Sequence, residues 1–314
     1  MTGPAPDPSR EARFSFPGLG TLVEVAARFE DPPRPAEAFR QMHDAVPAAL
    51  AAAARRLVED IEAQLSRFRE DSDVARLGRA GGAWAPVGNH TRAVLEAAAG
   101  LRAATEGLFD PAAPGRLFAT RDRPEPVPAA CPASPSRWAG EARVEAPGGL
   151  DLGAIGKGYA ADQLLRLCQE HGAAAAMAGV GVSSITLWAP PGQRPWRIGL
   201  RSPGGARDEA LGVLELRQGA VAASSMDEKP GHVADPRDGR PAASDLRQAT
   251  VLAPDGMLAE ACSTALLVGG TALAARLAAR LPEVACVLVT DAAVLVSPAL
   301  RRSFQPGPQP APPS

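Results

Sequence analysis

The sequence is organised around one stretch, DLGAIGKGY at residues 151–159. Its glycines, at 153, 156 and 158, precede a helix that the residue pattern predicts over residues 159–171. Glycine lets a backbone come close to a ligand, and the N-terminus of a helix attracts anions. The spacing matches neither a Walker loop nor the dinucleotide-binding fingerprint. A tight strand-to-helix turn without any ligand would use the same residues, so both interpretations stay open here.

Lysine is scarce in this chain, which makes its position in the stretch informative. Lys157 and Lys229 are the only lysines among 33 Lys and Arg residues. Lys157 stands between two glycines at the expected start of the helix, where a compact ammonium group can meet a phosphate. We therefore expect Lys157 to supply positive charge to a bound anion.

The overall composition is that of a globular protein with a sizeable core. Of 314 residues, 46% are hydrophobic and 22% are charged, which is ordinary for a folded domain. Lys and Arg (33) nearly balance Asp and Glu (35), which excludes the basic surface typical of a nucleic-acid binder. The four cysteines form no close pair, and neither a signal peptide nor a lipobox is visible. These features predict a cytoplasmic protein.

Strand and helix patterns alternate irregularly along the chain, which predicts a mixed α+β fold. Helices are expected over residues 36–67 (with a break at Pro47), 91–106, 159–171 and 258–281. Strands are expected within residues 14–29 and over 174–178, 184–189, 196–201, 211–217, 220–224, 249–252, 284–290 and 293–297. The longest uncharged run, at 173–191, contains glycines, serines and a Pro-Pro end. Two short buried strands around a turn explain that run better than a membrane span does.

A single domain of two interlocked lobes is expected over residues 13–302. Residues 1–12 and 303–314 are rich in proline and polar side chains and are predicted to be disordered tails. Residues 111–143 carry seven prolines and are predicted to form a long surface excursion.

Two further segments contain groups capable of chemistry. In HVADPRDGRP, at residues 232–241, a strong turn signal follows His232. In AEACSTA, at residues 259–265, a helix would place Glu260 and Thr264 on one face, where a carboxylate and a hydroxyl can bind Mg²⁺. The structural alternatives are a histidine that only supports the turn, and a helix with a favourable first-turn acid and a packing threonine.

In this order along the chain, the motifs resemble those of the ApbE-like family of FAD:protein FMN transferases. The resemblance covers most of residues 15–300. It rests mainly on DLGAIGKGYAAD at 151–162 and HVADPRDGRP at 232–241. The other matching motifs are GLGT at 18–21, LSRF at 65–68, GLFDP at 107–111, PWRIG at 195–199 and the segment 259–270.

The resemblance implies an α+β, T-fold-related architecture of mixed sheets flanked by helices, with a cleft for a flavin nucleotide. It also implies a Mg²⁺-dependent reaction with FAD as substrate. FMN would pass through a phosphoester to a Ser or Thr of a target protein, and AMP would leave. A non-catalytic FAD-binding protein, or a pyrophosphatase that yields FMN and AMP, would use the same site and remains an alternative.

Residue roles are implied by the resemblance as well. His232 would organise or deprotonate the incoming hydroxyl, and Lys157 would act as a catalytic cation. The residues implied in FAD contacts are Leu19, Phe68, Leu108, Phe109, Asp110, Asp151, Lys157 and Val233. The implied metal ligands are the carbonyl of Ala154 and the side chains of Glu260, Ser263 and Thr264. The family usually has Asp where this chain has Glu260, and the extra methylene extends the carboxylate by about 1.5 Å.

Overall fold

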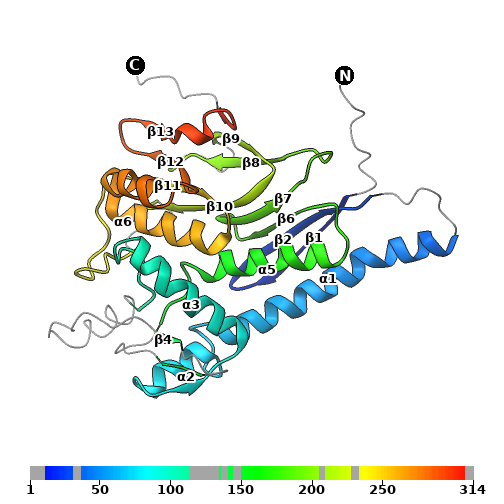
Figure 1. The fold of residues 1–314 in the computed structure, drawn as a ribbon, viewed down its shortest axis with the longest axis horizontal. Helices are drawn as coiled ribbons and strands as arrows, with labels where there is room; N and C mark the ends of the chain where they lie inside the picture. The colour runs from blue at the N-terminus through cyan, green and yellow to red at the C-terminus, as the bar shows by residue number, and fades with distance from the viewer. Residues whose placement is uncertain are drawn as a thin grey trace.

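The centre of the fold is an eight-stranded antiparallel sheet, in the spatial order β1-β2-β6-β7-β10-β11-β12-β13 (Figure 1). A computed structural model describes residues 11–30, 37–112, 134–135, 141–143, 150–204, 209–227 and 233–307. The strands of the large sheet are β1 (Glu11–Gly18), β2 (Thr21–Arg28), β6 (Ala175–Val180), β7 (Ser184–Trp188), β10 (Gln218–Ser225), β11 (Gln248–Ala253), β12 (Ala285–Val289) and β13 (Val294–Val296). The mixed α+β prediction is confirmed.

Helices lie on one side of this sheet (Figure 1). They are α1 (Glu37–Leu65), α2 (Asp73–Ala80), α3 (Asn89–Ala104), α5 (Gly156–Glu170) and α6 (Gly256–Arg280). α5 packs on β6 and β7, and α6 packs on β10 and β11. The strands meet them with buried small side chains, among them Ala176, Ala178, Ala220, Ala222 and Ala249. Small residues at these positions let the helices approach the sheet closely.

A second, three-stranded sheet covers part of the opposite face, in the order β14-β9-β8. Its strands are β8 (Trp196–Arg201), β9 (Ala210–Leu216) and β14 (Phe304–Pro306). Leu187 and Val287 of the large sheet share a buried apolar cluster with Ile198 and Leu214 of the small one. The 3₁₀ helix η2 (Pro298–Leu300) leads into β14, and the short strands β3 (Ala85–Pro86), β4 (Ser134–Pro135) and β5 (Glu141–Arg143) form a third sheet.

In the described part of the chain, α6 is the one helix long and apolar enough to cross a membrane. Within the fold, 67% of its apolar window is buried, and it packs against β10 and β11. The run at 173–191, which has a comparable length, forms the β6–β7 hairpin as predicted.

Three predictions about chain organisation are corrected. The predicted N-terminal tail, residues 1–12, ends too late, because β1 begins at Glu11 and pairs with β2. Pro47 lies inside α1 instead of breaking it, because one lost hydrogen bond is offset by the burial of Leu50, Val58 and Ile61 on the same helix. The predicted C-terminal tail begins too early, because β14 pairs with β9. Phe304 occupies the space beside Gly212, where a Cβ would lie 2.5 Å from its ring. Most of the predicted surface excursion at 111–143 lies outside the described residues.

Candidate functional site

The glycine-rich stretch forms the turn into α5, as its composition predicts. Asp151 Oδ1 accepts a hydrogen bond from Gly153 N at 2.8 Å, and Lys157 Nζ donates to Gly153 O at 2.8 Å. α5 begins at Gly156, earlier than expected from the sequence. The loop therefore presents its carbonyl side to a cation at the first turn of a helix.

Glu260 is the buried carboxylate of the site, and its side chain is 6% exposed. Its Oε2 accepts a hydrogen bond from Gly158 N at 2.8 Å, one of the first-turn N–H groups that a helix leaves without an internal partner. Its Oε1 accepts a hydrogen bond from Ser184 Oγ at 2.5 Å and lies 3.2 Å from Lys157 Nζ. A buried charge needs such partners, so these three groups fix the carboxylate in its orientation. We call Lys157, Ser184 and Glu260 the carboxylate cluster.

The close crossing of α5 and α6 brings Glu260 to the loop. A Cβ on Gly158 would lie 2.1 Å from the carbonyl oxygen of Gly256, so neither helix could carry a side chain there. Asp162 secures the crossing, because both its carboxylate oxygens accept from Gly256 N at 2.9 Å and Oδ1 accepts from Thr186 Oγ1 at 2.7 Å. Burial raises the pKa of Asp162 to about 6, against the opposing effect of these hydrogen bonds.

The predicted metal ligands on α6 lie beside this cluster. Ser263 Oγ donates to Glu260 O at 3.0 Å and lies 2.9 Å from Ser224 Oγ at the end of β10. Thr264 follows it and is half-buried. Ala154 is also half-buried and is next in sequence to Gly153, whose carbonyl already accepts from Lys157.

The donor chemistry around Glu260 fits Mg²⁺. The candidate ligands are oxygens: one carboxylate, two hydroxyls and the loop carbonyls. The described residues contain no group of three or more His, Cys, Asp and Glu that could hold a metal, and Mg²⁺ commonly uses one or two carboxylates together with substrate phosphates. The Lys157 ammonium already lies where the Gly153 carbonyl and Glu260 converge. This point therefore stabilises positive charge.

Some residues predicted to contact FAD meet one another in a second group. Arg67 Nη1 lies 3.2 Å from Asp151 Oδ2, and the Arg67 guanidinium lies 4.6 Å from the ring centroid of Phe68. Asp151 N donates to Pro111 O at 2.8 Å, which joins the GLFDP segment to the glycine-rich loop. Phe68 is 82% exposed. An exposed aromatic ring beside a guanidinium offers a stacking surface to a planar ligand.

The GLFDP residues themselves are largely structural in this arrangement. Leu108 and Phe109 are buried in the main core, and Phe109 is only 2% exposed. Asp110 is buried as well; its Oδ2 accepts from Arg102 Nε at 3.1 Å and its Oδ1 from Ala112 N at 2.9 Å. Their side chains hold the segment in place, so a contact of Leu108 or Phe109 with a ligand would involve the main chain.

The remaining predicted residues lie at two turns. Leu19, in the β1–β2 turn, has φ 52° and donates its N–H to Glu62 Oε2 of α1 at 2.9 Å. Val233 is half-buried, and its carbonyl accepts from Ala242 N across the DPRDG turn. His232 lies outside the described residues, so its role stays a prediction.

Ser184 and Arg67 were not among the predicted site residues. Ser184 directly follows Ser183, and with Thr186 they place three hydroxyls in an otherwise apolar run, which is the signal that could have found Ser184. Arg67 belongs to the quoted LSRF motif, but its pairing with Asp151 joins residues 84 positions apart and had no local signal.

Fold and site together define an α+β protein in which a glycine-rich loop and a buried carboxylate meet at one end of an antiparallel sheet. The ApbE family model matches residues 19–288. The chain therefore belongs to the ApbE family.

Curated relatives carry the name FAD:protein FMN transferase. The protein from Escherichia coli K12 is 31% identical over 129 residues, which cover 38% of this chain and 37% of the relative. The one from Rhodobacter capsulatus is 28% identical over 331 aligned positions, which cover 97% of this chain and 60% of the relative. The chain thus matches less than two thirds of the length of either relative.

Solved structures share the fold across nearly the whole chain. An ApbE protein from Thermotoga maritima superposes with a TM-score of 0.77 at 22% identity, covering 93% of this chain and 99% of that one. The flavinyl transferase ApbE of Pseudomonas stutzeri in its apo form gives a TM-score of 0.75 at 22% identity, covering 94% and 96%. These similarities confirm the predicted α+β fold of the family, and the flavin cleft stays a prediction.

Proposed function

We propose that the protein is a Mg²⁺-dependent FAD:protein FMN transferase that attaches FMN to a Ser or Thr of a target protein and releases AMP. The observation that carries the proposal is the carboxylate cluster at the glycine-rich loop, where Lys157 and Glu260 lie 3.2 Å apart at the start of α5. Family membership and the names of the curated relatives support the same activity.

The residues of this chain would divide the work as follows. The Phe68 ring would stack on a ring of FAD, and Lys157, at a helix start that favours anions, would bind a phosphate oxygen. Glu260, Ser263, Thr264 and the carbonyl of Ala154 would hold Mg²⁺. The ion would supply neutralisation of phosphate charge. Because Glu260 also contacts Lys157, the two cations would share one carboxylate.

In the reaction, the acceptor hydroxyl oxygen bonds to the phosphorus on the FMN side, the bridging P–O bond breaks and AMP leaves. His232 would accept the hydroxyl proton. Ser184 and Gly158 N–H would keep Glu260 in one orientation throughout, as they do in the structure.

The test uses FAD, MgCl₂ and a cell extract of the encoding organism as the source of acceptor. We expect a fluorescent protein band on a denaturing gel, AMP in solution, and loss of both after chelation of Mg²⁺. AMP release that is equal with and without extract, and without a fluorescent band, would instead identify a pyrophosphatase. FAD binding with neither product would identify a flavin-binding protein.

A further inference from the structure

A groove of about 670 Å³ lies on the face of the large sheet that α5 and α6 do not cover. The apolar part of its floor comes from three neighbouring strands, through Met177, Ile185 and Val221. Ile198 and Leu200 of β8 form one wall. None of the residues predicted to contact FAD or the metal lines this cavity. We call it the β8 groove.

β8 presents a free backbone edge to this groove. In the described chain β9 is the one strand that pairs with β8. Glu215 of β9 donates its N–H to Ser303 O, on the side away from β8. Arg197 is the register partner of Glu215, so its N–H and C=O also point away from the ladder. The N–H and C=O of Gly199, two residues further along β8, point the same way as those of Arg197.

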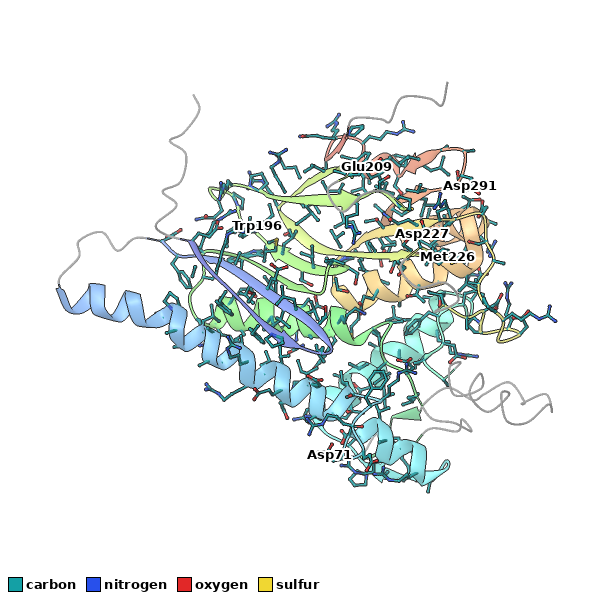
Figure 2. The ribbon with its side chains drawn as sticks, turned by 180° about the vertical axis from the view of Figure 1, so that it is seen from behind. Asp71, Trp196, Glu209, Met226, Asp227 and Asp291 are labelled. Atoms are coloured by element: carbon teal, nitrogen blue, oxygen red, sulfur yellow. The ribbon has the colours of Figure 1, made fainter. Side chains whose placement is uncertain are left out.

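The side-chain face of β8 that carries Ile198 and Leu200 packs on the large sheet, and the free edge of β8 borders the groove at Gly199. Arg201 O, at the end of β8, accepts a hydrogen bond from Gln248 Nε2 of β11 at 3.1 Å. Trp196, at the start of β8, stacks on Arg28 at the far end of β2. In Figure 2, Trp196 and Asp227 lie toward opposite ends of this face. β8 therefore runs along the groove and ends near Gln248.

The end of the large sheet near Gln248 also carries the carboxylate cluster. Ser183 lines the groove, and the next residue, Ser184, donates to Glu260 on the other face. Ser225 lines the groove, and the preceding residue, Ser224, contacts Ser263. Successive strand residues point to opposite faces. A chain lying in the groove would thus reach the carboxylate cluster by passing over the end of the large sheet.

We propose that the β8 groove binds an extended segment of the acceptor protein, next to the Ser or Thr that receives FMN; this rests on the proposed transferase function. The segment pairs as an added strand with the main-chain groups of Arg197 and Gly199, and places alternate apolar side chains on the groove floor. Arg197 and Arg201 are exposed on either side of Gly199. The segment is therefore acidic at its remaining positions.

The probe is a fluorescein-labelled peptide that alternates valine with aspartate, compared with the same peptide carrying lysine in place of aspartate. Gly199→Pro removes one edge N–H and leaves the ladder to β9 intact, because that N–H does not point to β9. Gly199→Ala is the matched control: it keeps the N–H, and its Cβ would meet no atom within 4 Å. Peptide binding is measured without FAD, with the melting temperature of each variant recorded.

We expect the aspartate peptide to bind the wild type and Gly199→Ala equally, Gly199→Pro at least tenfold more weakly, and the lysine peptide weakly throughout. In the double variant Arg197→Glu, Arg201→Glu the preference should reverse toward lysine, which gives an answer even if Gly199→Pro unfolds. Equal binding to Gly199→Pro when folded, no binding to the wild type, or an unchanged preference in the double variant would overturn the proposal.

The extract assay separates this proposal from the transferase function. We expect folded Gly199→Pro to bind FAD normally and to label acceptor protein at least tenfold more slowly than Gly199→Ala. Equal labelling would overturn the groove proposal and leave the transferase intact. If the wild type labels nothing, the transferase proposal fails, and peptide binding alone decides whether the groove is a peptide site.

Discussion

The two faces of the large sheet differ in how their polar groups are satisfied. On the helix face, Glu260 is buried and receives hydrogen bonds from Gly158 N and Ser184 Oγ. On the opposite face, β8 leaves the main-chain groups of Gly199 without a strand partner in the described chain. Buried polar groups that have hydrogen-bond partners keep their side chains in a fixed geometry. The free edge of a strand, in contrast, can pair with another chain. Under the two proposals, transfer chemistry takes place on the helix face and the acceptor is recognised on the opposite face.

The difference originates in side-chain size and in how much of each face is covered. Buried alanines on β6, β10 and β11 let α5 and α6 lie against the sheet. The smaller sheet covers the opposite face only in part, through the cluster around Leu187, Leu214 and Val287. The part near Met177 stays open and forms the floor of the groove.

Gly158→Ala should disrupt the packing of α5 against α6 and have the largest effect on stability. Alanine favours a helix by about 1 kcal/mol over glycine, but its Cβ would lie 2.1 Å from Gly256 O, a backbone atom that cannot rotate away. We expect a loss of about 4 kcal/mol or more in the free energy of unfolding, measured by urea denaturation. Gly199→Ala on the groove face should change it by less than about 0.5 kcal/mol. Equal effects would contradict the tight crossing of α5 and α6.

Asp162→Asn tests the same crossing through pH. The folded pKa of Asp162, about 6, exceeds its ordinary value of 3.8 because of burial. The folded state thus holds the proton more tightly, and the associated stability is present below about pH 4 and lost as pH rises through 6. We therefore follow the difference in unfolding free energy between the wild type and Asp162→Asn. This difference should fall by up to about 3 kcal/mol between pH 4 and 7.

Asp245→Asn provides a control of opposite sign for this pH series. Hydrogen bonds from Thr271 lower the pKa of Asp245, so its contribution is present above its ordinary pKa and is lost as pH falls. A difference curve for Asp162→Asn that is flat, or that rises with pH, would show that burial does not control this carboxyl.

Glu260→Gln sharpens the assignment of chemistry to the helix face. Glutamine keeps an acceptor for Gly158 N–H but loses the charge that faces Lys157. Flavin transfer in the extract assay should fall on the order of 100-fold, with FAD binding much less affected. Glu96→Gln, in an exposed ion pair with Arg92 on α3, which carries none of the predicted site residues, is the matched control and should transfer normally. A comparable loss in both variants would remove Glu260 from the mechanism.

Local signals predicted much of this molecule. Alternation and glycine placement located most strands and helices, and the scarcity of lysine singled out Lys157. The contact between Ser184 and Glu260 joins residues 76 positions apart, so it depends on the register of β7 against α6, which no local pattern encodes. β14 was missed because a three-residue strand gains its stability from pairing with β9 and from Phe304 packing at Gly212. The groove depends on the position of one sheet over another, which sequence periodicity does not define.

Phe68→Ala has the smallest expected effect and separates ligand binding from folding. At 82% exposure the ring contributes little to the core, so the unfolding free energy should change by less than about 0.5 kcal/mol. Loss of a stacking surface should weaken FAD binding about tenfold, corresponding to about 1.4 kcal/mol, measured by flavin fluorescence titration. Val182→Ala is the control, since Val182 is 69% exposed on the groove rim and should leave FAD affinity unchanged. If Val182→Ala weakened FAD binding and Phe68→Ala did not, flavin would bind on the groove face, and the division between the two faces would be reversed.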